Sequence, residues 1–241
     1  MEEVLFFIFA FLSTIIGTIA GFGSSTILLP LSLLFFDFKT ALVLVAFFHL
    51  FGNVGRVVFF RHGLDKRLIL LFGIPSVILA FIGALLVNYI NQNFLKLILG
   101  IFLLIFSITS LAKPKINFKP SKKNAIIGGS LSGFFAGLIG TAGVLRGAFL
   151  TSFNLRKKAY IATASLIAIG IDLTRIPIYV GSGFLNSNFY YYLPILFLVA
   201  FVGSYTGRKI VDKIPQKNFK KFVLIMIAII SLKFIYEGLV F

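Results

Sequence analysis

The sequence predicts an all-α polytopic membrane protein of two inverted five-segment repeats, with short broken or re-entrant helices and about 8 to 10 transmembrane segments. Of its 241 residues, 59% are apolar or aromatic and 12% are charged, and the mean hydropathy is +1.04. Soluble domains carry roughly 25% charged residues to cover their surface. Much of this chain must therefore face lipid. The apolar residues also form ten long runs, and markers in the first half recur in order in the second.

The apolar runs are separated by charged or turn-rich breaks, as expected where each helix needs about 20 apolar residues to cross a bilayer. In the first half they cover residues 4–20, 24–36, 40–60, 68–90 and 94–112. In the second half they cover residues 125–138, 142–153, 159–180, 190–210 and 219–240. We therefore expect a first membrane repeat over residues 1–112, a basic linker over 113–123 and a second membrane repeat over 124–241.

The duplication is predicted by residues that recur at an offset of about 116 to 125 positions. The matched pairs are Gly17 and Gly133, Gly21 and Gly137, Asn53 and Asp172, Arg56 and Arg175, Pro75 and Pro194, and Gly83 and Gly203. One or two matches arise by chance in so apolar a chain. The ordered series favours two homologous halves.

Loop charges predict that the two halves have opposite orientations in the membrane, as an odd number of segments per half requires. Residues 61–67 are basic, whereas the matching residues 181–188 carry no charge. Residues 88–93 are neutral, whereas residues 208–221 hold six basic side chains. Because basic loops collect in the cytoplasm, we expect a cell-membrane protein with both termini outside and the linker inside. Most of the formal charge of +16 then sets orientation, and no nucleic-acid partner is expected.

Two of the runs, residues 24–36 and 142–153, are too short to cross a ~30 Å hydrocarbon core. Each follows a glycine-rich break, where the chain leaves helical geometry and a Ser or Thr can cap the restarted helix. Interrupted segments at matching places in inverted halves predict a transport site near the midplane, and helix N-termini there favour an anion. The residues expected to bind it are Gly23, Ser24, Ser25, Thr26, Gly140, Thr141 and Ala142. For isolated glycines at four-residue spacing, close helix packing is the competing interpretation.

Four of the charged residues in the apolar runs call for a partner or a role, since each costs about 2.5 to 3.5 kcal/mol near a helix centre. They are Arg56, Arg146, Asp172 and Arg175. Arg146 lies in the first turn of the second short helix, where a cation opposes the helix dipole and a bound anion would compensate it; snorkelling to the cytoplasmic interface is the alternative. Arg56 and Arg175 are expected to line the approach, although Arg56 is also near enough to the basic loop to reach water. Three arginines against one carboxylate favour an anionic substrate.

Asp172 and His49 are the candidates for coupling transport to an ion. Asp172 precedes Arg175 by three residues, so an ion pair on one helix is the structural alternative to a role in proton coupling. His49 lies in mid-segment and can change charge near neutral pH, although a neutral, hydrogen-bonded histidine is the alternative. The expected coupling ion is a proton or sodium.

The inventory of reactive side chains argues against an enzyme. The chain has no cysteine and two histidines, and Asp172 has no second acid beside it. A nucleophile with a base, a metal cluster or paired carboxylates would be needed for catalysis. We therefore predict no catalytic residue, metal site or cofactor.

At its breaks the chain resembles the sulfite exporter TauE/SafE family, also called the toluene sulfonate uptake permease family. The resemblance rests on two homologous halves that each open with a glycine-rich break, the first reading GTIAGFGSS over residues 17–25 with Pro30 following. The second break, residues 140–143, is looser and has no following proline. The resemblance implies a permease or exporter of small organosulfur compounds or sulfur oxyanions.

The sequence thus predicts a secondary transporter of small anions that works by alternating access. A non-transporting membrane subunit of a larger complex is the alternative, and a membrane-embedded enzyme is a more distant one. A homo-oligomer is compatible with these features, and the lipid bilayer is the other expected partner.

Overall fold

The computed structural model describes residues 2–20, 23–60, 63–112, 118–210 and 216–240, and these contain helices and turns without a strand. In the first half the elements are α1 (Glu2–Ala20), α2 (Ser25–Ser32), α3 (Phe38–Phe60), α4 (Lys66–Leu68), the π turn η1 (Ile69–Gly73), α5 (Ile74–Leu86) and α6 (Gln92–Ala112). In the second half they are α7 (Lys122–Ile139), α8 (Gly143–Thr151), α9 (Lys157–Gly181), the 3-10 turn η2 (Ser187–Phe189), α10 (Tyr192–Ile210) and α11 (Gln216–Val240). Each of the ten apolar runs therefore contains a helix, and the all-α prediction is confirmed.

Within the described ranges, six helical stretches are long and apolar enough to cross a membrane. They are Phe38–Phe60, Lys66–Leu86, Gln92–Ala112, Lys157–Gly181, Ser187–Ile210 and Val223–Val240. Three come from each half, and many large apolar side chains on them face outward, as lipid contact requires. The protein is a multi-pass membrane protein, as the sequence predicts.

The first two helices of each half form a hairpin. α2 packs back against α1, and α8 packs back against α7. Within the second hairpin, the hydroxyl of Ser132 on α7 donates to the carbonyl of Ala142 at the start of α8, over 3.4 Å. α2 has eight residues and α8 nine, so each is about 12 to 14 Å long and ends inside the thickness of a bilayer. The short runs are therefore half-helices.

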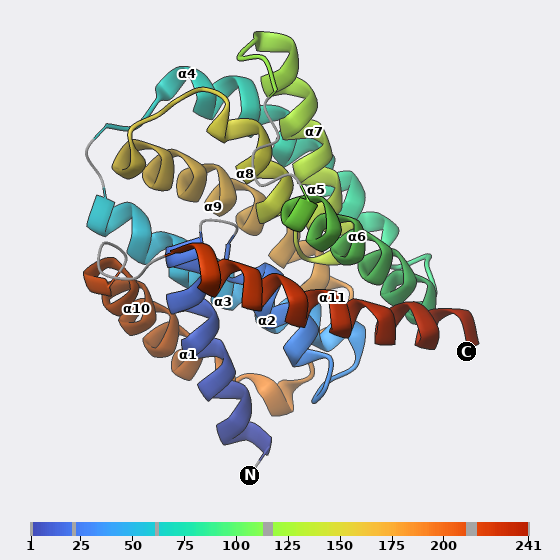
Figure 1. Ribbon diagram of the computed structural model, residues 1–241. Coiled ribbons are helices and arrows are strands. Elements are labelled where there is room, and N and C mark those ends of the chain that lie inside the picture. The colour runs from blue at the N-terminus through green and yellow to red at the C-terminus, as the bar shows by residue number, and fades with distance from the viewer. Residues whose placement is uncertain (1, 21–22, 61–62, 113–117, 211–215, 241) are drawn as a thin grey trace.

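Helices of the two halves exchange partners. α5 of the first half packs extensively against α7 of the second half. α10, which is the counterpart of α5 in the second half, packs against α1. The other large contacts between the halves are those of α3 with α9 and of α6 with α11 (Figure 1). In this view α1 and α10 lie at the lower left, α5 and α7 lie at the upper right, and α11 crosses in front. This pattern is the one expected of two repeats related by a pseudo-two-fold axis.

Glycines allow some of these helices to approach backbone to backbone. A Cβ on Gly133 of α7 would collide with the carbonyl of Ser76, and one on Gly137 with the carbonyl of Ala80. The packing interpretation of these glycines is therefore confirmed. Gly17 faces the backbone of Ser24 within its own hairpin. The matching Gly21 and residues 113–117 of the linker lie outside the described residues.

Candidate functional site

The two breaks meet inside the protein. Thr26, in the first turn of α2, and Thr141, just before α8, are 0% and 1% exposed, and their hydroxyl oxygens lie 2.9 Å apart. Gly23 and Gly140 both have positive φ, +88° and +75°. This left-handed backbone favours glycine, and in each half it redirects the chain from a long helix into a short one. Matching breaks in the two halves thus share one interior region.

The prediction that a Ser or Thr side chain caps each short helix is wrong. Ser24 occupies the N-cap of α2, but its hydroxyl makes no cap bond and instead accepts from Arg56 Nη2 over 3.4 Å. α8 begins after Ala142, which has no hydroxyl, and the neighbouring Thr141 faces Thr26 instead. The hydroxyls of the breaks are therefore used between elements rather than within one helix.

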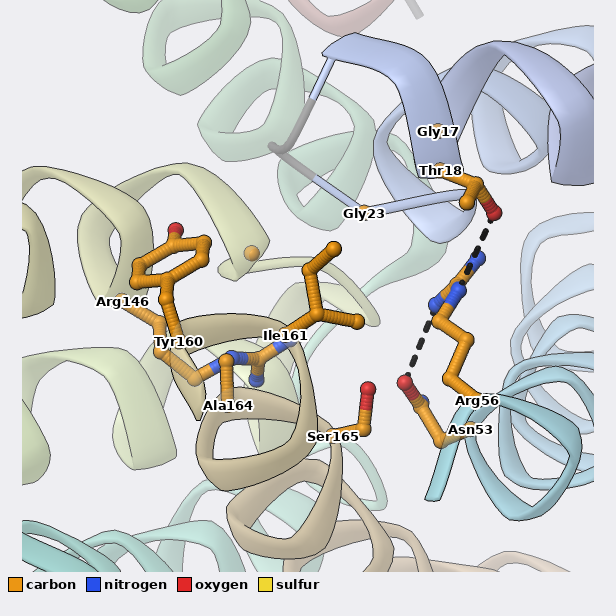
Figure 2. Close-up of a pocket in the computed structure, with 11 residues that line it drawn as sticks. Gly17, Thr18, Gly23, Asn53, Arg56, Arg146, Tyr160, Ile161, Ala164 and Ser165 are labelled. Atoms are coloured by element: carbon orange, nitrogen blue, oxygen red, sulfur yellow. Dashed lines mark hydrogen bonds between the residues drawn. The ribbon is translucent and has the colours of Figure 1, made fainter. Parts of the chain in front are cut away.

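A cavity of about 40 Å³ lies beside the breaks (Figure 2). Its wall comes from α1, the first break, α3, α8 and α9. The lining residues are Gly17, Thr18, Gly23, Asn53, Arg56, Gly143, Arg146, Tyr160, Ile161, Ala164 and Ser165. Of the residues expected from the sequence, Gly23, Arg56 and Arg146 line it. The remaining break residues, Ser24, Ser25, Thr26, Gly140, Thr141 and Ala142, lie behind this wall.

Arg56 is held against the end of α1 by neutral oxygens. Its Nε donates to Thr18 Oγ1 over 3.2 Å and its Nη1 to Asn53 Oδ1 over 3.0 Å, in addition to the bond to Ser24. The side chain is 5% exposed, so the alternative in which it reaches water is wrong. Three hydrogen bonds orient the guanidinium, and none of these partners carries a negative charge.

Arg146 extends from α8 into the cavity from the side opposite Arg56, as Figure 2 shows. It is 6% exposed, which does not fit a side chain that snorkels to an interface. Within the part of the chain that the structure describes, its side chain makes no hydrogen bond or ion pair. The opposite charge that acts on it from a distance is that of Asp172, which Arg175 and His49 already contact. A buried guanidinium without such partners is costly, and a bound anion would lower that cost.

The two coupling candidates lie together in a buried cluster with Arg175. Asp172 Oδ1 accepts from Arg175 Nε over 3.0 Å and from its Nη2 over 2.8 Å, which confirms the ion pair expected from the spacing. Asp172 Oδ2 lies 2.8 Å from Nδ1 of His49 on α3. Arg175 also donates from Nη1 to the carbonyl of Ala136 at the end of α7. It is therefore outside the cavity wall, although the sequence predicts it along the approach.

The two halves use matching arginines in matching places. Arg56 anchors the end of α1 through Thr18, and Arg175 anchors the end of α7 through Ala136. The residue three positions earlier differs, because Asn53 is neutral and Asp172 is charged. The charge of Arg175 is therefore neutralised by Asp172, whereas Arg56 has neutral hydrogen-bond partners and its positive charge remains available to an anion.

The sequence analysis missed the wall that α9 contributes. Tyr160, Ile161, Ala164 and Ser165 are spaced one and four residues apart, which places them on one helical face. The small residues Ala164 and Ser165 in an apolar run were the available signal. The face itself becomes identifiable only when the rotation of α9 relative to Arg146 is known.

Comparison with known proteins agrees with the resemblance at the breaks. The family model described as sulfite exporter TauE/SafE matches residues 6–234. A "probable membrane transporter protein" of Methanocaldococcus jannaschii is 29% identical over an alignment of 247 positions, which covers 93% of this chain and 90% of that protein. The "probable membrane transporter protein YfcA" of Escherichia coli (strain K12) is 26% identical over 167 residues, which cover 65% of this chain and 60% of that protein. These names indicate membrane transporters and not enzymes.

Proposed function

Because the chain belongs to the sulfite exporter TauE/SafE family, a family of membrane transporters, we propose that it is a secondary transporter of small anions, sulfur oxyanions or organosulfonates. The anion binds in the cavity between the two helical hairpins and crosses the membrane by alternating access.

The observation that carries this proposal is the pair of arginines on opposite sides of the cavity. Arg56, Arg146, Arg175 and Asp172 are all buried. Arg175 and Asp172 neutralise each other, so two positive charges remain, and both belong to residues that line the cavity. An anion between them receives charge-assisted hydrogen bonds and offsets the cost of burying the two guanidinium groups.

The volume of the cavity favours a small anion. A water molecule needs roughly 10 to 15 Å³ of such space, so about 40 Å³ holds about three or four water-sized groups, which suits a small oxyanion. Sulfite, sulfate and methanesulfonate are of this size, and an aromatic sulfonate is larger. We therefore favour inorganic sulfur oxyanions and short alkyl sulfonates as substrates.

Basic residues near the cavity support its entry from the cytoplasmic side. Asn53 and Arg56 lie in the last third of α3, and Tyr160 lies in the first turn of α9, directly after the basic residues 156–158. Basic loops are typical of the cytoplasmic side, and this supports an orientation with both termini outside. On the opposite side, Arg175 and Tyr179 bind carbonyls at the end of α7. We propose that these two bonds break when the site opens outward.

Transport by the purified full chain in proteoliposomes tests this function. We expect saturable uptake of labelled sulfite, sulfate or methanesulfonate, weak uptake of benzenesulfonate, and no uptake of labelled sodium together with these anions. Uptake by the protein alone would also contradict the alternative of a non-transporting subunit. If none of the small anions is transported or exchanged, the proposed function is wrong.

A further inference from the structure

One buried nitrogen has no partner. His49 is 4% exposed, and its Nδ1 faces Asp172. Its Nε2 is buried and has no hydrogen-bond partner within the described ranges. That nitrogen faces Gly23, where an added Cβ would lie 3.8 Å away, and the same Cβ would lie 3.6 Å from Gly143 Cα. Both glycines line the cavity, whereas His49 does not, so its Nε2 is buried next to the cavity wall at Gly23.

The partners of Asp172 determine which nitrogen of His49 carries a proton. Asp172 is paired with Arg175, and an ionised carboxylate can only accept hydrogen bonds. His49 Nδ1 therefore carries a hydrogen. In the neutral imidazole, Nε2 is then a bare lone pair, which repels an anion. In the imidazolium, Nε2 carries a hydrogen and the ring carries a positive charge, which attracts an anion in the neighbouring cavity.

Both oxygens of Asp172 are already used, which argues against sodium at this place. Oδ1 binds Arg175, and Oδ2 faces His49. A hard cation needs free oxygen ligands, and two arginines in the immediate surroundings repel it. The unused atom of the cluster is a nitrogen that binds a proton.

We propose that the anion is transported together with one proton, which binds His49 Nε2 next to Gly23 while the anion occupies the cavity. This inference rests on the proposed function and names its coupling ion. The proton comes from the water on the side of entry, binds the Nε2 lone pair and leaves from the same nitrogen on the other side. A monovalent anion then crosses with no net charge.

The surroundings of His49 make its protonation depend on the anion. α9 brings Asp172 and Arg175 toward the ring, and α8 brings Arg146. Its own helix carries Arg56, one of the two arginines on the cavity wall. The first break presents Gly23, and α10 packs on α3 through the neutral Ser204. In the empty site the arginines oppose a further positive charge, and an anion removes that opposition. Binding of the anion and of the proton therefore strengthen each other.

Methanesulfonate is the suitable probe, because its sulfonate stays ionised and every proton that is taken up must bind the protein. Calorimetry of the full chain in two buffers of different ionisation enthalpy counts protons per anion. We expect uptake of about one proton, and about tenfold weaker binding per pH unit above the pH at which the empty site is deprotonated. His49→Gln should take up none and bind with an affinity that does not change with pH. His62→Gln is the matched control, since the chain has only these two histidines.

The His62→Gln protein also gives a direct measurement, because His49 is then its only histidine. In ¹⁵N NMR we expect a neutral ring with the hydrogen on Nδ1 before methanesulfonate is added, and an imidazolium afterwards. This result does not require His49→Gln to fold. Binding without proton uptake, an unchanged ring spectrum, or full proton uptake by His49→Gln would overturn the inference while leaving anion transport intact. Failure to bind any small anion would instead contradict the proposed function.

Discussion

The hydroxyls of Thr26 and Thr141 lie 2.9 Å apart, although 115 residues separate them in the chain. Their contact joins the starts of the two short helices, where the first hairpin meets the second. α2 also packs on α8, and the two hydroxyls add a polar contact between the two breaks. A conformational change that moves one hairpin relative to the other has to break or relocate this bond.

Replacing these threonines tests the link between the breaks. Thr26→Val and Thr141→Val should each lower the free energy of unfolding by about 0.5 to 1.5 kcal/mol, because a buried hydroxyl loses its partner. The double variant should cost less than the sum of the two, which thermal unfolding of the purified protein measures as a coupling energy. Thr151→Val is the control, since that exposed hydroxyl bonds only within its own helix. Strictly additive effects would show that the two hydroxyls do not interact.

The backbone contact between α7 and α5 predicts a sharp difference between two glycines. Gly133→Ala places a Cβ on the carbonyl of Ser76, where neither backbone can yield, and should lower stability by about 1 to 3 kcal/mol or more. Gly181→Ala meets no atom within 4 Å and should leave stability within about 1 kcal/mol of the parent protein. Thermal unfolding of both variants checks this. Equal effects would contradict the close packing of α5 on α7.

Much of the helical arrangement was predictable, because it depends on features of short stretches of sequence. Apolar runs place the helices, glycine-rich breaks place the hairpin tips, and a spacing of three residues places Arg175 beside Asp172. The contact between His49 and Asp172 was not predictable, because 123 residues separate them and spacing says nothing of how α3 is rotated toward α9. For the same reason Arg175 was expected along the approach, and it lies behind the cavity wall.

The different partners of the two matching arginines lead to a prediction for Asn53. Asn53→Asp gives Arg56 the carboxylate that Asp172 gives Arg175, with almost no change in shape. The new charge pair neutralises one side of the cavity, so anion affinity should fall at least about tenfold while the folded protein without anion is not destabilised. Binding of methanesulfonate and thermal unfolding measure the two effects. Asn88→Asp, at an exposed position, should change neither, and undiminished binding by Asn53→Asp would exclude Arg56 as a ligand of the anion.

Ala164 limits the width of the cavity from α9. Ala164→Leu adds three carbons to a wall that encloses about 40 Å³, so it should abolish anion binding by filling the space. The side chain is half-buried, and we expect the protein to fold. Ala112→Leu, at the exposed end of α6, is the control and should bind anions normally. Full transport by Ala164→Leu would show that the anion takes another path.

Arg146 gives the most decisive test of the site, because its buried side chain lines the cavity and makes no hydrogen bond or ion pair within the described part of the chain. Arg146→Gln removes the positive charge and keeps a polar, although shorter, side chain. Without anion the variant should be as stable as the parent or more stable, since an uncompensated buried charge is costly. Its anion binding should fall at least about tenfold, and added methanesulfonate should no longer raise its unfolding temperature. Arg67→Gln, at an exposed position of α4, controls for the loss of a positive charge and should behave like the parent. A variant Arg146→Gln that is strongly destabilised but still binds the anion would assign Arg146 a structural role and place the anion elsewhere.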